Sequence, residues 1–93
     1  MLEMRKVYVV ERRDQVDIIA GILEAAKENG GTKTQIMHSA NLNHQQIERY
    51  LTLLIKRGLL KREKQRKKRL FKTSEKGLKY IREYRELKNS LRL

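Results

Sequence analysis

The spacing of apolar residues changes along the chain, and these changes divide it into elements. From Asp14, a plausible N-cap, apolar residues recur at helical spacing, and the pattern predicts a helix that ends at the pair Gly30-Gly31. Before it, the β-branched run at residues 6–10 predicts a short strand. The apolar stripe of the helix comprises Val16, Ile19, Ala20, Leu23 and Ala26, widened by Ile22.

Two further helices are predicted close together. Thr32 can cap a short helix over residues 33–39, and a turn at Asn41 and Leu42 follows it. Asn43 then caps a third helix, and Gln46, three residues later, gives the spacing of a capping box. Gly58 ends that helix. The predicted inward residues are Ile36 and Met37 in the first of these helices, and Ile47, Leu51 and Leu54, flanked by Tyr50, in the second.

Residues 59–63 and 69–73 are predicted to form two strands, and residues 64–68 to form the tip that joins them. The tip has no Gly, Asn or Asp, so the sequence does not indicate its turn type. Ser74 starts a last helix. Its residues Tyr80, Tyr84, Leu87 and Leu91 are spaced four, three and four apart, which is a heptad seam and predicts a homodimer interface. Alternatively Leu78, Ile81 and Tyr84 pack on the domain's own core.

The order strand, helix, helix, turn, helix, hairpin, helix is that of a winged helix-turn-helix. We therefore expect a mainly α fold with a small β-hairpin (α+β). Residues 1–73 would form the winged domain with its N-terminal strand, and residues 74–93 a C-terminal dimerisation helix. In such a domain the third helix enters the major groove of double-stranded DNA.

Charge supports this interpretation because it is concentrated in one place. The formal net charge is +12. Ten of the seventeen residues from Lys56 to Lys72 are Lys or Arg, and the one acidic residue among them is Glu63. Such a run needs a polyanion opposite it, which could be DNA, RNA or an anionic membrane surface. The run coincides with the predicted hairpin, so its charges form a basic wing.

The exposed face of the third helix supplies the candidate base contacts. Gln can bond adenine and Arg can bond guanine with two hydrogen bonds each. Glu48 lies on the same face and would repel phosphate. The predicted base-contacting residues are His44, Gln45, Gln46, Arg49 and Thr52.

Phosphate contacts are expected from two places, the start of the second helix and the wing. Free N–H groups and the helix dipole favour an anion at the former. Phe71 is expected in the core and not as a platform for base stacking. The predicted phosphate-contacting residues are Thr32, Lys33, Thr34, Lys61, Arg62, Lys64, Arg66, Lys67, Lys68 and Arg69.

Several functional classes find no support in the sequence. The sequence has no Cys, and neither His38 nor His44 has a neighbouring ligand for a metal site. No nucleophile–base pair or phosphate-binding loop is evident. We therefore expect no enzyme activity, metal or cofactor. No apolar run is long enough to span a membrane or to form a signal peptide. We expect a cytoplasmic, nucleoid-associated protein that has no membrane partner.

The blocks KTQIMHSANL and IERYLTLLIKRGLL, followed by TSEKG, resemble the archaeal ten-kilodalton winged-helix proteins of the "Sso ten-a" type. The resemblance runs from Arg12 to Tyr84. It implies a winged-helix fold, a homodimer joined through antiparallel C-terminal helices, and binding of double-stranded DNA by a regulator or chromatin protein. Two alternatives remain: a protein-interaction module of a transcription complex, and an RNA-binding protein.

Overall fold

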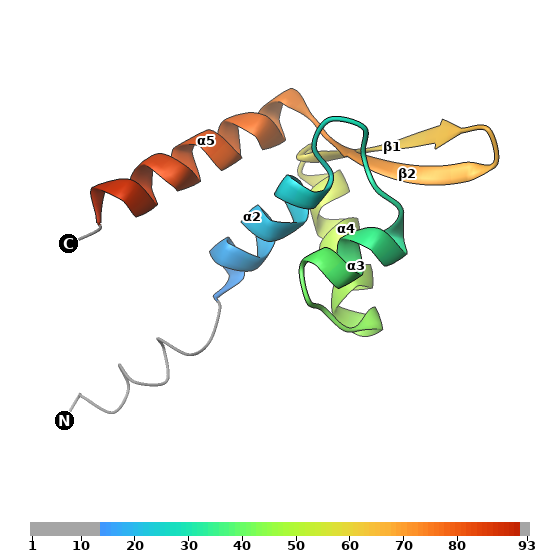
Figure 1. The fold of residues 1–93 in the computed structure, drawn as a ribbon, viewed down its shortest axis with the longest axis horizontal. Coiled ribbons are helices and arrows are strands. Elements are labelled where there is room, and N and C mark those ends of the chain that lie inside the picture. Colours follow the sequence, from blue (N-terminus) through green and yellow to red (C-terminus); the bar gives the residue numbers. More distant parts are fainter. Residues whose placement is uncertain (1–13, 92–93) are drawn as a thin grey trace.

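The computed structural model describes residues 14–91, which form four helices and one antiparallel hairpin (Figure 1). From the first helix onward, the predicted order of elements is confirmed, as is the mainly α class with a small hairpin. The strand predicted at residues 6–10 lies outside the described residues. The elements are α2 (Gln15–Ala25), α3 (Lys33–Ser39), α4 (His44–Lys56), β1 (Leu60–Gln65), β2 (Lys68–Thr73) and α5 (Glu75–Ser90).

The four helices begin where the sequence predicts. The side chains of Asp14, Thr32, Asn43 and Ser74 each accept a hydrogen bond from a backbone N–H of the first turn. The predicted end of the first helix is wrong, because α2 stops at Ala25. The chain then turns through two residues with positive φ, Glu28 and Gly30, before it enters α3. The glycine pair therefore belongs to the loop and not to the helix end.

Side chains from all four helices meet in one core. Six of them are almost completely buried and fill the space between the helices: Ile22, Leu23, Ile36, Ile47, Leu54 and Ile81. The predicted stripe of α4 is confirmed, and Tyr50 is buried beside it. Val16, which the periodicity placed in the stripe of α2, is 48% exposed because it lies in the first turn, at the margin of the core.

The strands are longer, and their connection shorter, than the sequence predicts. β1 and β2 pair from Leu60↔Thr73 to Gln65↔Lys68, which leaves a turn of the two residues Arg66 and Lys67. Arg66 has φ 56°, in the region that glycine prefers. Since no turn-forming residue type occupies the tip, the sequence alone did not reveal this tight turn.

The base of the hairpin is fixed to the helical core. The first pair, Leu60 and Thr73, is buried, and the Thr73 hydroxyl donates to the carbonyl of Leu23 in α2 at 2.6 Å. The loop before α3 adds an isolated antiparallel β-bridge, in which Gly31 and Phe71 exchange two backbone hydrogen bonds of 3.0 and 2.8 Å. The wing therefore projects from an anchored base.

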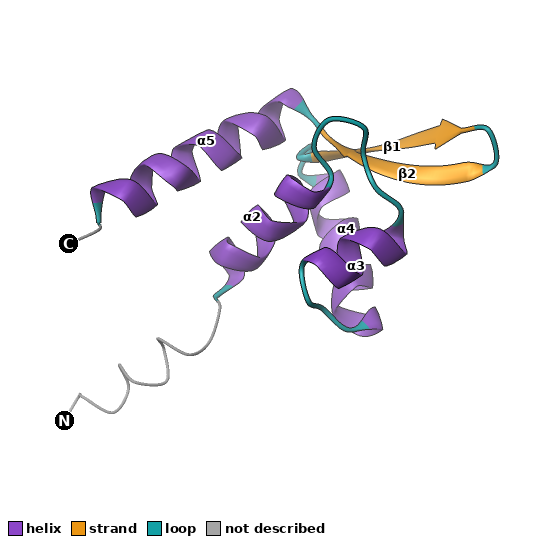
Figure 2. Cartoon of the chain, in the orientation of Figure 1, coloured by secondary structure: helices purple, strands orange, loops and turns teal. Residues whose placement is uncertain are grey.

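α5 leaves the hairpin in the opposite direction, so the wing and the C-terminal helix extend to opposite sides (Figure 2). The junction is tight at Gly77. A methyl group there would lie 2.5 Å from Cγ2 of Thr73 and closer still to the carbonyl oxygen of Leu59. Since both neighbours belong to the hairpin and its entry, this contact couples the angle of α5 to the position of the wing.

Replacing Gly77 by Ala is expected to destabilise the protein by about 1–3 kcal/mol, because backbone must move to admit the methyl group. Gly21→Ala in α2 is the matched control. Its added methyl group meets nothing within 4 Å, so this helix should gain up to ~1 kcal/mol. Urea unfolding measures both variants. Equal stabilities of the two would contradict the tight junction.

Candidate nucleic-acid interface

The polar face of α4 is available for contact with another molecule. His44, Gln45, Arg49 and Thr52 are all exposed, as predicted from the burial of the opposite face. Gln45 and Arg49 have side chains long enough to reach base edges from a helix. This face is the candidate reading surface.

Two of the predicted base-contacting residues already use part of their hydrogen-bonding capacity within α4. The side-chain oxygen of Gln46 accepts from the N–H of Asn43 at 3.0 Å, which completes the predicted capping box. The Thr52 hydroxyl donates to the carbonyl of Glu48 at 3.0 Å. Thr52 can therefore only accept from a base or offer its methyl group. Of the other three, Gln45 and Arg49 carry the amide and guanidinium groups that can form two hydrogen bonds with one base.

Glu48 forms an ion pair that links α4 to α3. Its carboxylate accepts a hydrogen bond from the Lys33 ammonium group, and Nε2 of His44 lies 3.9 Å from the same oxygen. The hydrogen bond from Lys33 lowers the pKa of Glu48. Lys33, a predicted phosphate contact, is thus already paired with a carboxylate. The two residues are fifteen positions apart, and no spacing in the sequence indicated the contact.

Thr32 and Thr34 flank Lys33 at the start of α3. Thr32 acts as the N-cap: its hydroxyl accepts from the N–H of Gln35 at 3.2 Å, and its own N–H donates to the Gln35 side chain at 2.9 Å. Thr34 is exposed. The capping role expected of Thr32 is confirmed, and contact of these residues with phosphate stays a prediction.

The register of the hairpin separates its charges onto two faces. Residues directly opposite each other in an antiparallel pair share a face, and successive residues alternate. Arg62 pairs with Phe71 and Lys64 with Arg69, so these four side chains lie on one face. Lys61, opposite Lys72, lies on the other face, as does Glu63. On the face that carries Phe71, every charged side chain of the two strands is therefore basic, namely Arg62, Lys64 and Arg69.

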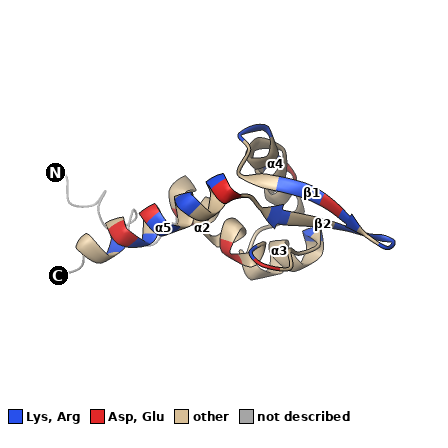
Figure 3. Ribbon diagram, turned by 90° about the horizontal axis from the view of Figure 1, so that it is seen from above, with Lys and Arg blue, Asp and Glu red and all other residues tan. Residues whose placement is uncertain are grey.

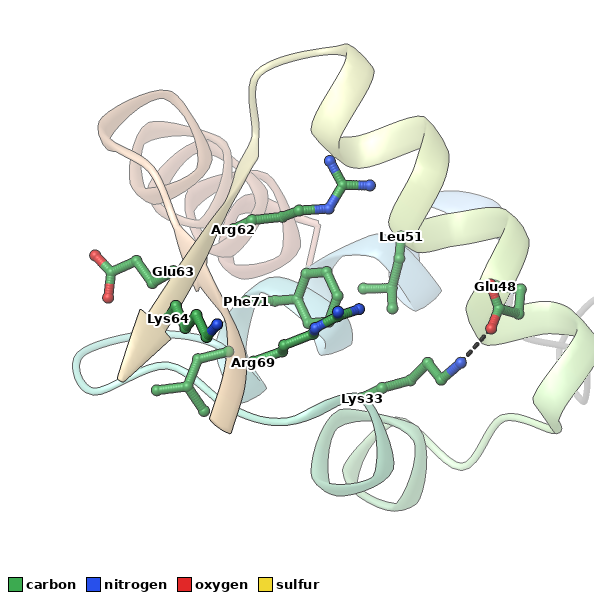
Figure 4. A pocket seen from close by; sticks show the side chains of 9 residues that line it. Lys33, Glu48, Leu51, Arg62, Glu63, Lys64, Arg69 and Phe71 are labelled. Atoms are coloured by element: carbon green, nitrogen blue, oxygen red, sulfur yellow. Dashed lines mark hydrogen bonds and ion pairs between the residues drawn. The ribbon is translucent and has the colours of Figure 1, made fainter. Parts of the chain in front are cut away.

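The basic face of the hairpin borders a hollow of about 430 Å³ between the wing, α4 and the start of α3 (Figure 4). Arg62 and Arg69 point from the strands toward α4, and Leu51 and Phe71 lie between the two sides. Glu63 also borders the hollow, but its carboxylate points away from α4. Phe71 packs against the core cluster, as predicted. The sequence did not show that it also lines this hollow.

The remaining predicted phosphate contacts lie at the far end of the wing. Arg66, Lys67 and Lys68 are exposed at and beside the turn, where the ribbon of the hairpin carries the colour of Lys and Arg (Figure 3). Lys68 starts β2 opposite Gln65. The wing therefore presents basic side chains along its whole length.

The predicted dimer seam on α5 divides into two halves. The hydroxyl of Tyr80 donates to the carbonyl of Val16 at 3.3 Å, and that of Tyr84 donates to the carboxylate of Asp17. The bond with Asp17 raises the pKa of Tyr84 to about 12. Both tyrosines thus bind α2 of their own chain, whereas Leu87 and Leu91 are 56% and 67% exposed.

α2 and α5 are also joined by charged groups. Arg85 pairs with Glu24, and Nζ of Lys88 lies 3.7 Å from Asp17. The Tyr84 hydrogen bond is the main cause that lowers the pKa of Asp17. These contacts hold α5 along α2. Leu87 lies between Arg85 and Lys88 in the sequence, and Leu91 comes after both. The alternative in which α5 packs on the domain's own core is confirmed for Leu78 and Ile81. Tyr84, the third residue of that alternative, bonds Asp17 of α2 instead.

Within residues 14–91, no helix is both long and apolar enough to cross a membrane. The same part of the chain holds no group of three His, Asp or Glu side chains that could bind a metal ion. The described residues thus offer no membrane-spanning helix and no metal site beside the surface formed by α4 and the wing.

Comparisons with known proteins agree with this geometry. Residues 12–92 match the family model described as winged helix-turn-helix. Sso10a-2, a DNA-binding protein from Sulfolobus solfataricus, has a similar structure, with a TM-score of 0.71, 24% identity and 85% of each chain covered. MepR from Staphylococcus aureus, in a complex with DNA, matches with a TM-score of 0.69 and 14% identity over 95% of this chain and 73% of that one.

An uncharacterized protein of Methanocaldococcus jannaschii is 36% identical over 55 residues, which are 59% of this chain. The match spans 57% of that relative's length. The predicted resemblance to the archaeal ten-kilodalton proteins is confirmed by the structural match to Sso10a-2. The fold, the order of its elements and the family match over nearly the whole chain agree, and this chain belongs to the winged helix-turn-helix family.

Proposed function

We propose that this protein binds double-stranded DNA, as a transcription regulator or a chromatin-associated protein. One observation carries the proposal: the basic face of the hairpin and the exposed polar face of α4 border the same region of the surface. α4 would enter the major groove while the wing follows the phosphate backbone. Sso10a-2 and MepR, which share the fold, are DNA-binding proteins, and this similarity supports the proposal.

The two parts of the surface would have different tasks. Arg62, Lys64 and Arg69, with the tip residues Arg66 and Lys67, would neutralise phosphates and supply most of the affinity. Gln45 and Arg49 would contact base edges and supply sequence preference. Lys61, on the opposite face of the hairpin, would contribute less than the sequence suggests, although its charge is the same.

We also propose that the protein forms a homodimer through the end of α5. Leu87 and Leu91 are large apolar side chains left exposed on one helix, and Val16 of the adjacent α2 is exposed too. Since Tyr80 and Tyr84 bind α2 within the chain, the dimer seam would be shorter than the heptad pattern predicts. The protein would act in the cytoplasm, associated with the nucleoid.

Titration with a random-sequence duplex at several salt concentrations tests the DNA proposal. Arg62→Gln/Arg69→Gln should lower the slope of log affinity against log salt by ~1.8, or ~0.9 for each lost phosphate contact. Lys61→Gln/Lys72→Gln removes the same charge from the opposite face. It should change the slope less than half as much. Equal effects would show that only net charge matters.

A third variant in the same titrations separates sequence preference, which base contacts supply, from affinity, which phosphate contacts supply. Gln45→Ala/Arg49→Ala should leave the slope for random duplex within ~0.9 of the wild type, since at most one phosphate contact is lost. In a selection from random duplexes, any motif that the wild type enriches should weaken by about 1–3 kcal/mol for each lost base contact. A wild type whose affinity hardly depends on salt would refute the proposed function.

Leu87→Glu/Leu91→Glu tests the dimer. Sedimentation equilibrium should show a dimer for the wild type and a monomer for the variant, because two carboxylates in a small apolar seam cost several kcal/mol. Glu83→Gln/Glu86→Gln, exposed positions of the same helix, should leave the mass unchanged. A monomeric wild type would contradict this proposal and leave the DNA proposal standing.

A further inference from the structure

Glu48 is an unexpected residue type at its position. It is the one acidic residue of α4, and its side chain is 53% exposed on the polar face of that helix. Under the proposed function, this face approaches a polyanion. A carboxylate there repels phosphate, and it can serve as a base contact only by accepting a hydrogen bond, as from cytosine. Its presence therefore requires a reason.

Fold stability does not supply that reason. The partner of Glu48, Lys33, has a side chain that is 38% exposed, so both members of the ion pair remain in contact with water. Exposed pairs of this kind contribute about 0–1 kcal/mol. α3 and α4 are also held together by the buried side chains of Ile36 and Ile47, which do not need the pair. Its main consequence is electrostatic.

The location of the ion pair shows what its electrostatic effect would be. Lys33 and Glu48 lie at the edge of the hollow whose other side carries Arg62 and Arg69 (Figure 4). A phosphate that enters the hollow would be attracted by both arginines. The same phosphate meets the negative charge of Glu48 and must compete with it for the Lys33 ammonium group. The carboxylate thus occupies a cation that would otherwise be available to DNA.

We propose that Glu48 limits the sequence-independent binding of DNA in two ways. Its carboxylate pairs with Lys33 in place of a DNA phosphate, and its negative charge repels the DNA backbone. This inference rests on the proposed function. It deepens that function because a lower affinity for arbitrary duplex leaves a larger share of the discrimination to Gln45 and Arg49. Glu48 is thereby a specificity-determining residue without having to touch a base.

Glu48→Gln tests the inference, and Glu63→Gln is the control. Both raise the net charge by one, and both residues border the same hollow, but the carboxylate of Glu63 points away from α4. With a random-sequence duplex, Glu48→Gln should steepen the salt slope by ~0.9, because Lys33 gains a phosphate contact. Between about 50 and 200 mM salt this adds an affinity loss of about 3.5-fold. Glu63→Gln should show less than half of this change.

A double-mutant cycle with Lys33→Gln isolates the role of the pair. The steepening caused by Glu48→Gln should disappear when Lys33 is absent, leaving only the gain from lost repulsion. Circular dichroism of each variant checks that the fold is kept. Equal effects of Glu48→Gln and Glu63→Gln, or a weaker affinity of Glu48→Gln for random duplex, would overturn the inference. A wild type that does not bind duplex would instead refute the proposed function itself.

Discussion

The register of the hairpin is the constraint on which the candidate site depends. Because side chains alternate along a strand, a shift by one residue would turn Arg62 and Lys64 away from α4 and bring Glu63 in. Three features fix the register: the buried pair Leu60 and Thr73, the hydrogen bond from Thr73 to Leu23, and the pairing of Phe71 with Gly31. Core packing thereby sets the electrostatics of the wing.

The same anchored base relates the wing to both neighbouring helices. The Thr73 side chain that bonds α2 also lies against Gly77, where α5 begins. Ser74, the cap of α5, donates to the carbonyl of Gly58 just beyond α4, at 2.6 Å. One short segment therefore positions the basic hairpin, the end of α4 and the start of α5. If α5 pairs two copies and α4 binds DNA as proposed, these contacts determine how the two α4 helices are presented to one duplex.

Most of the fold could be predicted from local patterns. Caps such as Thr32 and Asn43, the stripe of α4 and the glycine after it depend on residues within a few positions of each other. The pair between Lys33 and Glu48 and the packing of Tyr84 on α2 depend on how separate helices meet, and no spacing encodes that. The basic run predicted a wing, but only the pairing of its strands shows which cations share a face with α4.

Lysine acetylation footprinting in the presence and absence of duplex DNA tests the central claim directly. Lys61 and Lys64 lie three residues apart on the same exposed strand, but on opposite faces of the hairpin. If the face toward α4 binds the phosphate backbone, saturating duplex should protect Lys64 strongly and leave Lys61 reactive. Equal protection of both lysines, or protection of Lys61 alone, would contradict the claim that the register of the hairpin builds the DNA-binding surface.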